Sequence, residues 1–498
     1  MARLPTPGGD SGVWGDVLNA FLDVEHNTDG SLKRSADIDT ALTRYTKPGA
    51  GIPITDLTSG LQTTLNNALQ KNEHVVYARD YGAVFDNATN DAVALQAAIA
   101  AAITANKPLL LGAGTAIVGA PLTISGPITI IGMGREETIL KAANGLNDYV
   151  IKFAAGAGNP VTGAHFADFA VDGNADNQTA GGGISADGAV QCSFERVHCY
   201  SSYNWGLKLG PMQGGAYGHH NRVLSCLFDN SNNSDGFGGG VWLTGSDENW
   251  LIACDFENLG GALNPVGSRP VALLDQAGLQ HFISLNFVGG GNNCIGIRIQ
   301  DQSNTRIIGS TFDGVAGDNI FIVGSSNIVA NNLFASTGDQ GNVAASAIHL
   351  EFGTHYNIIS GNNIQTDGDA GKTRSLIREE ATGGSGDNLI VDNVLVQNAA
   401  PTVALVESAG TNTILRNNLG WRTEATGAAT VANGTTSIAV THTLAATPAL
   451  ANISVTPTNS MGTATKFWIS GVGATQFTIN VNADPGATTA TFVWNARF

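Results

Sequence analysis

A loose repeat in the middle of the chain constrains its fold more than any other feature of the sequence. Apolar residues recur at intervals of 22 to 31 residues, each after a short strand-like run and a turn rich in Gly, Ser, Asn and Asp. They are Phe169, Val197, Phe228, Phe256, Phe287, Phe312, Phe334, Ile364, Val394 and Leu419. Self-similarity at a short period is typical of solenoids, in which each repeat is one structural unit.

The runs between these turns alternate apolar and polar residues, as at positions 296–299 and 319–322. This alternation has the period of a β-strand, and none of these runs has the period of a helix. One unit cannot bury its own apolar face, so the units must stack with strands about 4.8 Å apart. The sequence therefore predicts an all-β chain built on a parallel β-helix of about ten rungs between Gly112 and Leu419.

A second file of residues precedes the apolar file by two positions. Its members are Cys226, Cys254, Leu285, Ser310, Asn332, Asn362, Asp392 and Asn417. We expect the late Asn residues to form a ladder of side-chain amides inside a turn, each bonded to its copy one rung away. The two cysteines are expected to be small buried side chains rather than a disulfide. Neither Cys-x-x-Cys nor a His-rich metal spacing occurs, so the sequence predicts no metal and no cofactor.

Composition excludes several classes of protein. The net charge of the 498 residues is -17, which argues against nucleic acid as a partner. No run of 18 apolar residues is present, so no membrane span is expected. The N-terminus lacks the apolar core of a secretory signal. Gly accounts for 63 residues and charged residues for only 13%, as suits a turn-rich β protein.

Two segments before the solenoid have helical patterns. The pattern in residues 1–50 predicts a helix with an apolar face at Trp14, Val17, Leu18, Phe21 and Leu22. This opening resembles the N-terminal segment of phage tail structural proteins, which docks the protein on the particle; the alternative is a helical appendage without a partner. In residues 51–74, Leu recurs every four positions from 57 to 69. Such a narrow stripe predicts a trimeric helical neck, or else packing on the chain's own β-helix.

The segment 75–103 reads as a strand, a turn and a helix capped near Asn90 or Asp91, and the helix would close the first rung. With the rungs at 109–111 and 128–134, it resembles the entry motif of the pectate-lyase-superfamily right-handed parallel β-helix of phage tailspikes. The resemblance implies a β-helix over 75–420, but it implies no particular reaction because the motif is structural. Residues 421–498 predict an antiparallel β-sandwich that resembles tail-fibre C-terminal domains and would serve in trimerisation or in glycan or receptor binding.

Carboxylates that share a file of the β-helix are the best candidates for catalysis. Neighbouring rungs would place two of them about 5 Å apart and alternate rungs about 10 Å, near the separations of retaining and inverting glycosidases. The first group is Asp229, Glu257 and Asp313, just after the apolar file. The second choice is Asp247, Asp275 and Asp301, with Glu248, at the turn after the middle strand. The alternative is that these are ordinary acidic residues of surface turns.

The outward positions of the middle strand are the candidates for substrate binding. They are Lys208, Trp242, Arg298, Phe321 and His349. Aromatic rings stack on sugars and Arg binds carboxylates, so this file would suit an acidic polysaccharide. The same residues could instead form a subunit interface.

Three functions fit these observations. The first is a homotrimeric phage tailspike, which docks on the tail or baseplate through its N-terminus and binds and cleaves a host surface polysaccharide as a hydrolase or lyase. It would be made in the host cytoplasm and reside on the virion tail. The second is a non-catalytic receptor-binding or structural tail protein of the same architecture. The third, a free polysaccharide-degrading enzyme, is disfavoured by the docking-like N-terminus and the missing signal.

Overall fold

The computed structural model describes Asp16 and residues 74–498. Within the second range it omits residues 157, 212–217, 230–238, 258–268, 276–277, 290–293, 301–303, 339–344, 367, 370–371, 381–383, 402 and 409. The chain divides into two compact units, 1–73 and 74–498, and the account below concerns the second. The expected docking segment and neck, apart from Asp16 and His74, lie outside the described residues.

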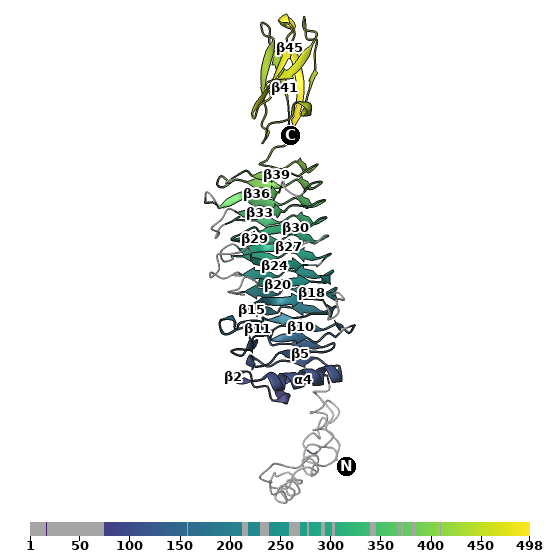
Figure 1. The fold of residues 1–498 in the computed structure, drawn as a ribbon, viewed down its shortest axis with the longest axis vertical. Helices are drawn as coiled ribbons and strands as arrows, with labels where there is room; N and C mark the ends of the chain where they lie inside the picture. The colour runs from purple at the N-terminus through teal and green to yellow at the C-terminus, as the bar shows by residue number, and fades with distance from the viewer. Residues whose placement is uncertain are drawn as a thin grey trace, which may run out of the picture. The chain divides into compact units, whose positions relative to one another are not determined.

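Three parallel sheets form a coil, as predicted (Figure 1). Sheet 1 has 13 strands, from β1 (Val76–Tyr77) to β40 (Ile414–Arg416). Sheet 2 has 12 strands, from β2 (Asp86–Asn90) to β38 (Val394–Val396), and sheet 3 has 11, from β5 (Leu122–Ile124) to β39 (Val406–Ser408). The chain visits the three sheets in turn, so each strand pairs with its copy one turn away. This architecture is a right-handed parallel β-helix.

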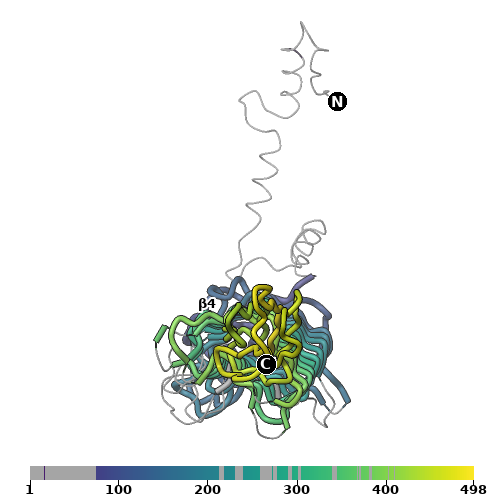
Figure 2. The backbone as a smooth tube through the Cα atoms, turned by 90° about the horizontal axis from the view of Figure 1, so that it is seen from above, coloured from purple at the N-terminus to yellow at the C-terminus, as the bar shows by residue number. Residues whose placement is uncertain are grey.

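One turn of the coil shows the order of its parts. It runs from β22 (Trp250–Ile252) in sheet 1 to β23 (Asp255–Glu257) in sheet 2 and β24 (Arg269–Asp275) in sheet 3, then to β25 (His281–Ile283) in sheet 1. Only Ala253 and Cys254 separate β22 from β23, and Ala253 adopts a left-handed conformation with φ 52°. This short corner recurs from turn to turn, so the turns of the coil overlie one another in the view from above (Figure 2).

The predicted stack of apolar residues forms the core. The rings of Phe228, Phe256, Phe287, Phe312 and Phe334 are buried and stack face to face, with centroids 4.6 to 5.2 Å apart. Burying one Phe side chain is worth about 1.5–3 kcal/mol. The file therefore supplies a large part of the apolar burial that holds the central turns together.

The ends of this file differ from the prediction. Before Phe228 the stacked residues are Cys199 and Val171, whereas Val197 and Phe169 belong to the corner file two positions earlier. After Ile364 the stacked residue is Leu395, so the predictions of Val394 and Leu419 were wrong. These two residues are 37% and 69% exposed.

The amide ladder is confirmed, with one change of members. The side-chain Nδ2 of each Asn donates to Oδ1 of its copy in the next turn along the series Asn332, Asn362, Asn393 and Asn418. Asn393 and Asn418 replace the predicted Asp392 and Asn417. A second ladder joins Asn327, Asn357 and Asn388 at another corner. The cysteines at 226 and 254 are free and buried, as expected.

The predicted helix closes the start of the coil. It is α4 (Ala92–Ala105), and its buried Leu95 and Ile99 pack on the first turns. Asp91 occupies the N-cap, but its carboxylate accepts hydrogen bonds from the backbone N–H groups of Val84 and Phe85. Asp91 thus fixes the preceding turn instead of capping the helix. Among the described residues, no helix is long and apolar enough to cross a membrane.

The C-terminal residues form the predicted antiparallel sandwich. One sheet pairs β41 (Glu424–Val431), β46 (Ala490–Arg497) and β43 (Ile453–Pro457). The other pairs β42 (Ser437–Thr441), β45 (Gln476–Val481) and β44 (Phe467–Ser470). A separate core that includes Phe477, Phe492 and Trp494 fills the space between them. This core is separate from the one inside the coil.

Candidate functional site

The first acidic group lies in one outward file of sheet 2. Asp229 ends β19 (Leu227–Asp229) and is the register partner of Glu257 in β23. Asp313 ends β29 (Thr311–Asp313), two strands beyond Glu257, with Val288 between them. Strand spacing therefore puts Asp229 and Glu257 about 4.8 Å apart along the file. The structure brings together the pair that the sequence analysis placed on neighbouring rungs, and it keeps Asp313 farther away.

Further polar groups, which the sequence analysis missed, share this face. Tyr200, at the end of β15 (His198–Tyr200), is the register partner of Asp229 on the other side. The ring of His198 lies 4.8 Å from that of Tyr200. Buried Asp172, at the end of β11 (Ala170–Asp172), follows Tyr200 in the file and lies 3.3 Å from the ammonium group of Lys141. Asp172 and Tyr200 were missed because the sequence analysis placed Phe169 and Val197 in the interior file instead of Val171 and Cys199.

Burial shapes the chemistry of this face. It lowers the pKa of His198, against opposing effects of Glu136 and Asp229, so the imidazole is neutral at pH 7. It also raises the pKa of Tyr200 to about 12, with smaller contributions from Asp172 and Glu136. Oδ1 of Asp229 is buried without a hydrogen-bond partner among the described residues. The face thus presents carboxyl groups beside a neutral imidazole and a neutral phenol, all of which can exchange or position protons.

The second acidic group does not form one file. Asp247 belongs to β21 (Ser246–Asp247), in a separate four-stranded sheet, and its carboxylate accepts a hydrogen bond from the N–H group of Gly278. Asp275 ends β24 in sheet 3, where its register partner is Thr244. Asp301 lies outside the described residues, and Glu248 pairs with His220. The strand of sheet 3 and the following corner have separate registers, so Asp247 and Asp275 lie in different sheets.

The predicted substrate-binding residues do form one file, on the outer face of sheet 3. Lys208 in β16 (Trp205–Leu209) pairs in register with Trp242 in β20 (Gly239–Thr244), and its ammonium group lies 5.1 Å from the Trp242 ring. The next strand is β24, and beyond it Arg298 lies in β27 (Cys294–Gln300). The Arg298 guanidinium lies 5.2 Å from the ring of Phe321. His349 comes next. We call these residues and their neighbours in register the sheet 3 file.

The sheet 3 file extends beyond the predicted residues in both directions. Register adds Lys152 and Ser185 before Lys208, and Arg378 and Glu407 after His349. The predicted carboxylate pair lies on sheet 2, so the two predicted groups face outward from different sheets. The structure therefore separates the predicted substrate-binding file from the predicted carboxylate pair.

Carboxylates do gather around the C-terminal part of the sheet 3 file. His349 lies in β33 (Ala345–Leu350), and its Nδ1 is 2.7 Å from Asp318 Oδ2 while its Nε2 is 3.3 Å from Glu380 Oε1. Glu380 also pairs with Arg378, and Glu351 is close by. The sequence analysis missed Asp318, Glu351 and Glu380. They are brought together by register across turns of unequal length, and no fixed spacing in the sequence signals that.

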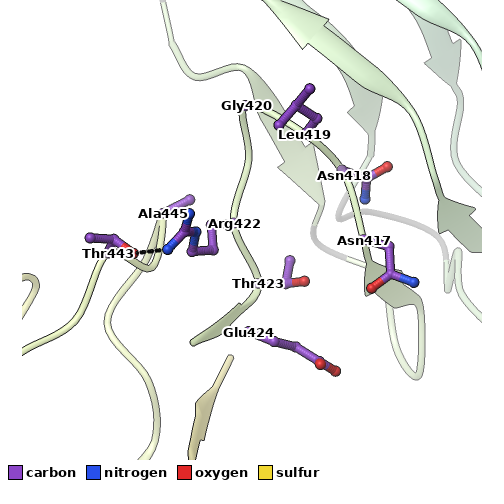
Figure 3. A pocket seen from close by; sticks show the side chains of 9 residues that line it. All are labelled: Asn417, Asn418, Leu419, Gly420, Arg422, Thr423, Glu424, Thr443 and Ala445. Atoms are coloured by element: carbon purple, nitrogen blue, oxygen red, sulfur yellow. Dashed lines mark hydrogen bonds between the residues drawn. The ribbon is translucent and has the colours of Figure 1, made fainter. Parts of the chain in front are cut away.

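A cavity of about 510 Å³ lies elsewhere, beside the last turn of the coil (Figure 3). Asn417 and Leu419 line it together with Arg422, Glu424 and Thr443. The Arg422 guanidinium donates a hydrogen bond to the Thr443 hydroxyl. None of the candidate acidic or substrate-binding residues lines this cavity, so it supports none of the predicted sites.

Comparisons with known proteins agree with the fold. Residues 75–171 match the family model "Rhamnogalacturonase A/epimerase, pectate lyase-like". The Dettilon tailspike protein is 14% identical to this chain, and its crystal structure matches with a TM-score of 0.50. The match covers 93% of this chain and 99% of the Dettilon chain. Protein ORF18 of Geobacillus virus E2 is also 14% identical to this chain, with a TM-score of 0.50. That match covers 86% of this chain and 80% of the ORF18 chain. A search of curated proteins finds no match.

The matched segment is the one that contains the capping helix and the first turns of the coil. The two solved structures are similar to this chain over most of its length. Their sequence identity is low, so the similarity concerns the fold alone. Residues 75–171 are thus similar to this pectate-lyase-like family, and the chain forms the parallel β-solenoid that is also found in the Dettilon tailspike protein.

Proposed function

We propose that this protein is a phage tailspike of the virion tail that binds a host surface polysaccharide on sheet 3 and depolymerises it. The sheet 3 file is the observation that carries the proposal. It carries Lys152, Lys208, Trp242, Arg298, Phe321 and Arg378 in one register along sheet 3, with Ser185 and Leu273 at the two intervening positions and the buried His349 after Phe321. Cations and aromatic rings in one line suit a chain of acidic sugars. They are conspicuous in a protein whose net charge is -17.

We assign the chemistry to Asp229 and Glu257. Their strand spacing of about 4.8 Å is close to the separation of about 5–5.5 Å in retaining glycosidases. One carboxyl group would protonate the leaving oxygen while the other attacks the sugar, and water would then release the product. The neutral imidazole of His198 and phenol of Tyr200 would orient the sugar or carry protons. The polysaccharide would reach this pair from sheet 3 by passing the edge between the two sheets.

Incubation of the full-length protein with capsule or O-antigen from candidate hosts tests the proposal. New reducing ends indicate hydrolysis, and absorbance from unsaturated uronates indicates a lyase. Binding without either product would favour the second candidate, a non-catalytic receptor-binding tail protein. Failure to bind any acidic polysaccharide would contradict the role of the sheet 3 file.

One observation favours a receptor-binding role for the C-terminal sandwich. The outer face of the sheet formed by β42, β45 and β44 has an aromatic ring at Trp468, which is 49% exposed. Its neighbours on that face are uncharged: Ser437, Ala439, Thr441, Ser470, Gln476, Thr478 and Asn480. An exposed indole among hydroxyl and amide groups suits a neutral sugar, which stacks on the ring and hydrogen-bonds beside it.

Replacing Trp468 by Ala is expected to weaken glycan binding about three- to tenfold, because one ring–sugar contact is worth about 0.5–1.5 kcal/mol. Titration of the glycan into the full-length protein measures this, and Trp468→Ala should leave the cleavage rate at saturating substrate unchanged. Val493→Ala, an exposed apolar change on the other sheet of the sandwich, is the control. If wild type and Trp468→Ala bind the glycan with equal affinity, the proposed receptor-binding role of the sandwich is wrong.

We propose that the protein is a homotrimer and that sheet 1 supplies the interface within the β-helix. Neighbouring strands of this sheet present aliphatic side chains outward, in two adjacent files. They are Leu224, Ile252, Ile283, Ile308, Ile328, Ile358, Leu389, Val391 and Ile414. Most of these side chains are half-buried and Ile414 is exposed, and an apolar band of this kind favours a protein–protein interface. We further propose residues 51–74 as the trimeric neck and residues 1–50 as the segment that docks on the phage tail or baseplate.

A charge placed in this face should separate the subunits. Ile358→Glu, in β34 (Ile358–Ser360), is expected to raise the trimer dissociation constant at least about tenfold, because three carboxylates would be buried without partners. Sedimentation velocity over a range of concentrations measures the change. Asn363→Glu, in β35 (Asn363–Gln365) of the same turn, lies on sheet 2 and should leave the trimer intact. A wild-type protein that sediments as a monomer would contradict the proposal.

A further inference from the structure

The residues around His349 form a compact group of metal-binding side chains. Glu351 follows β33 and Glu380 follows β36 (Thr373–Glu379), and these strands are neighbours in sheet 3 (Figure 1). Leu350 pairs in register with Glu379, so the next two residues, Glu351 and Glu380, also lie side by side. One ligand atom from each of His349, Glu351 and Glu380 lies within 4.8 Å of the others. One nitrogen and two carboxylate oxygens thus converge on one point.

The hydrogen bonds of His349 fix which nitrogen faces that point. Asp318 Oδ2 lies 2.7 Å from Nδ1, and Asp318 Oδ1 accepts a hydrogen bond from the backbone N–H group of Ser346. The carboxylate is therefore held in place and accepts the Nδ1 proton. Nε2 is then left as a potential ligand atom, directed toward Glu380. A carboxylate behind the imidazole in this way is the usual partner of a metal-bound histidine.

The charges of the group do not balance among the described residues. Asp318, Glu351 and Glu380 carry three negative charges, whereas Arg378 pairs with Glu380 alone. The nearby Arg374 is already paired with the Glu407 carboxylate. The Glu351 side chain has no ion pair in the part of the chain that the structure describes. The group thus holds three carboxylates and one guanidinium, and one divalent cation would offset the difference.

We propose that His349, Glu351 and Glu380 bind a divalent transition-metal ion, with Asp318 as the residue that orients His349. One imidazole and two carboxylates are a mixed nitrogen and oxygen set, which suits Zn²⁺ or Mn²⁺ better than Mg²⁺ or Ca²⁺, ions that prefer oxygen ligands alone. Three protein ligands leave at least one coordination position open. No spacing in the sequence signals the site, because Glu380 comes from the turn after the one that holds His349 and Glu351.

The location of the site suggests what the open position would bind. The ring of Phe321 lies 4.8 Å from that of His349, edge to face, and Arg298 lies beyond it in the same file. An acidic sugar bound along the file would place a carboxylate or hydroxyl group on the ion. This part of the inference rests on the proposed polysaccharide binding, whereas binding of the ion itself does not.

Titration of the full-length protein with Mn²⁺ after removal of metals tests the site, followed by electron paramagnetic resonance and calorimetry. We expect one Mn²⁺ per chain, displaced by Zn²⁺ but not by Mg²⁺. Glu351→Gln and Glu380→Gln should each weaken binding at least about tenfold, and Asp318→Asn about 10- to 100-fold through the loss of His349 orientation. Asp255→Asn, which changes a carboxylate on sheet 2, is the control and should bind as wild type does.

Thermal unfolding separates loss of the site from loss of the fold. Mn²⁺ should raise the melting temperature of the wild type and of Asp255→Asn but not that of Glu351→Gln, since a ligand of the native state stabilises it by mass action. Glu351 has no partner in the group, so its substitution should not unfold the chain. Absence of Mn²⁺ and Zn²⁺ binding in the wild type, or equal affinity in Glu351→Gln and Glu380→Gln, would overturn the inference, whatever the outcome for polysaccharide cleavage.

Discussion

Replacing Asp229 by Asn, or Glu257 by Gln, is expected to lower the rate of polysaccharide cleavage about 10²- to 10⁴-fold. Each change keeps the shape of the side chain and removes its ability to donate or accept a proton, and general acid–base catalysis contributes about this much. Polysaccharide affinity should change little, because binding is assigned to the sheet 3 file. Initial rates of release of reducing ends or unsaturated uronates, at saturating substrate, measure the effect.

The matched control for these variants is Asp255→Asn. Asp255 lies on the same strand as Glu257, two residues earlier, and faces outward in the neighbouring file. It has the register partners Leu227 and Asn286, so no second carboxylate lies beside it in that file. Asp255→Asn should cleave at the wild-type rate. Asp313→Asn should show a smaller loss than Asp229→Asn, because Asp313 is two strands away from Glu257.

Two results would contradict the assignment in different ways. Wild-type rates in both Asp229→Asn and Glu257→Gln would remove sheet 2 as the catalytic face. A loss of cleavage in Glu380→Gln alongside those rates would place the chemistry on sheet 3, next to the bound polysaccharide. If the wild type binds a polysaccharide but does not cleave it, the catalytic assignment fails and the receptor-binding role remains.

The fold could be predicted from the sequence because the same strand pattern and the same interior apolar position recur in every turn of a β-helix. Period-two strands and an interior apolar residue, which is Phe in the central turns, are local features, and stacking follows because one turn cannot bury that residue alone. The prediction failed where two adjacent residues could fill the same position. At Asp392-Asn393 and Asn417-Asn418 the first residue takes the left-handed turn and the second forms the amide ladder. The sequence offers two short polar residues for each role, so it could not fix the register there.

The candidate sites were harder to predict because they depend on register between turns of unequal length. Asp229 and Glu257 were found because both follow an interior Phe directly, which ties them to the core. Asp318 lies in a turn, and its place beside His349 depends on how β30 (Ile320–Val323) pairs with β33. Which carboxylates converge there is a property of the assembled coil and not of any segment.

Glu379→Ala is expected to lower the free energy of unfolding of the last turns by about 3 to 5 kcal/mol. The side chain is 2% exposed and points into the coil, as the strand alternation at Ile377 and Glu379 requires. Its carboxylate accepts four hydrogen bonds, from Asn388 Nδ2, Ser408 Oγ, the Gly410 N–H group and Thr413 Oγ1. Each buried donor left without an acceptor costs about 1–3 kcal/mol, although the two hydroxyl groups can rotate toward other acceptors.

The effect should be local, because each turn of a solenoid contacts only its neighbours. Hydrogen exchange should therefore quicken in β36 and β39 and in β40, while amides of β19 and β23 keep their wild-type protection. Glu407→Gln on the adjacent strand is the control. Its carboxylate faces outward and pairs with Arg374, so its loss should cost about 1 kcal/mol or less. Equal protection of the last turns in Glu379→Ala and Glu407→Gln would mean that the interior carboxylate does not hold the end of the coil together.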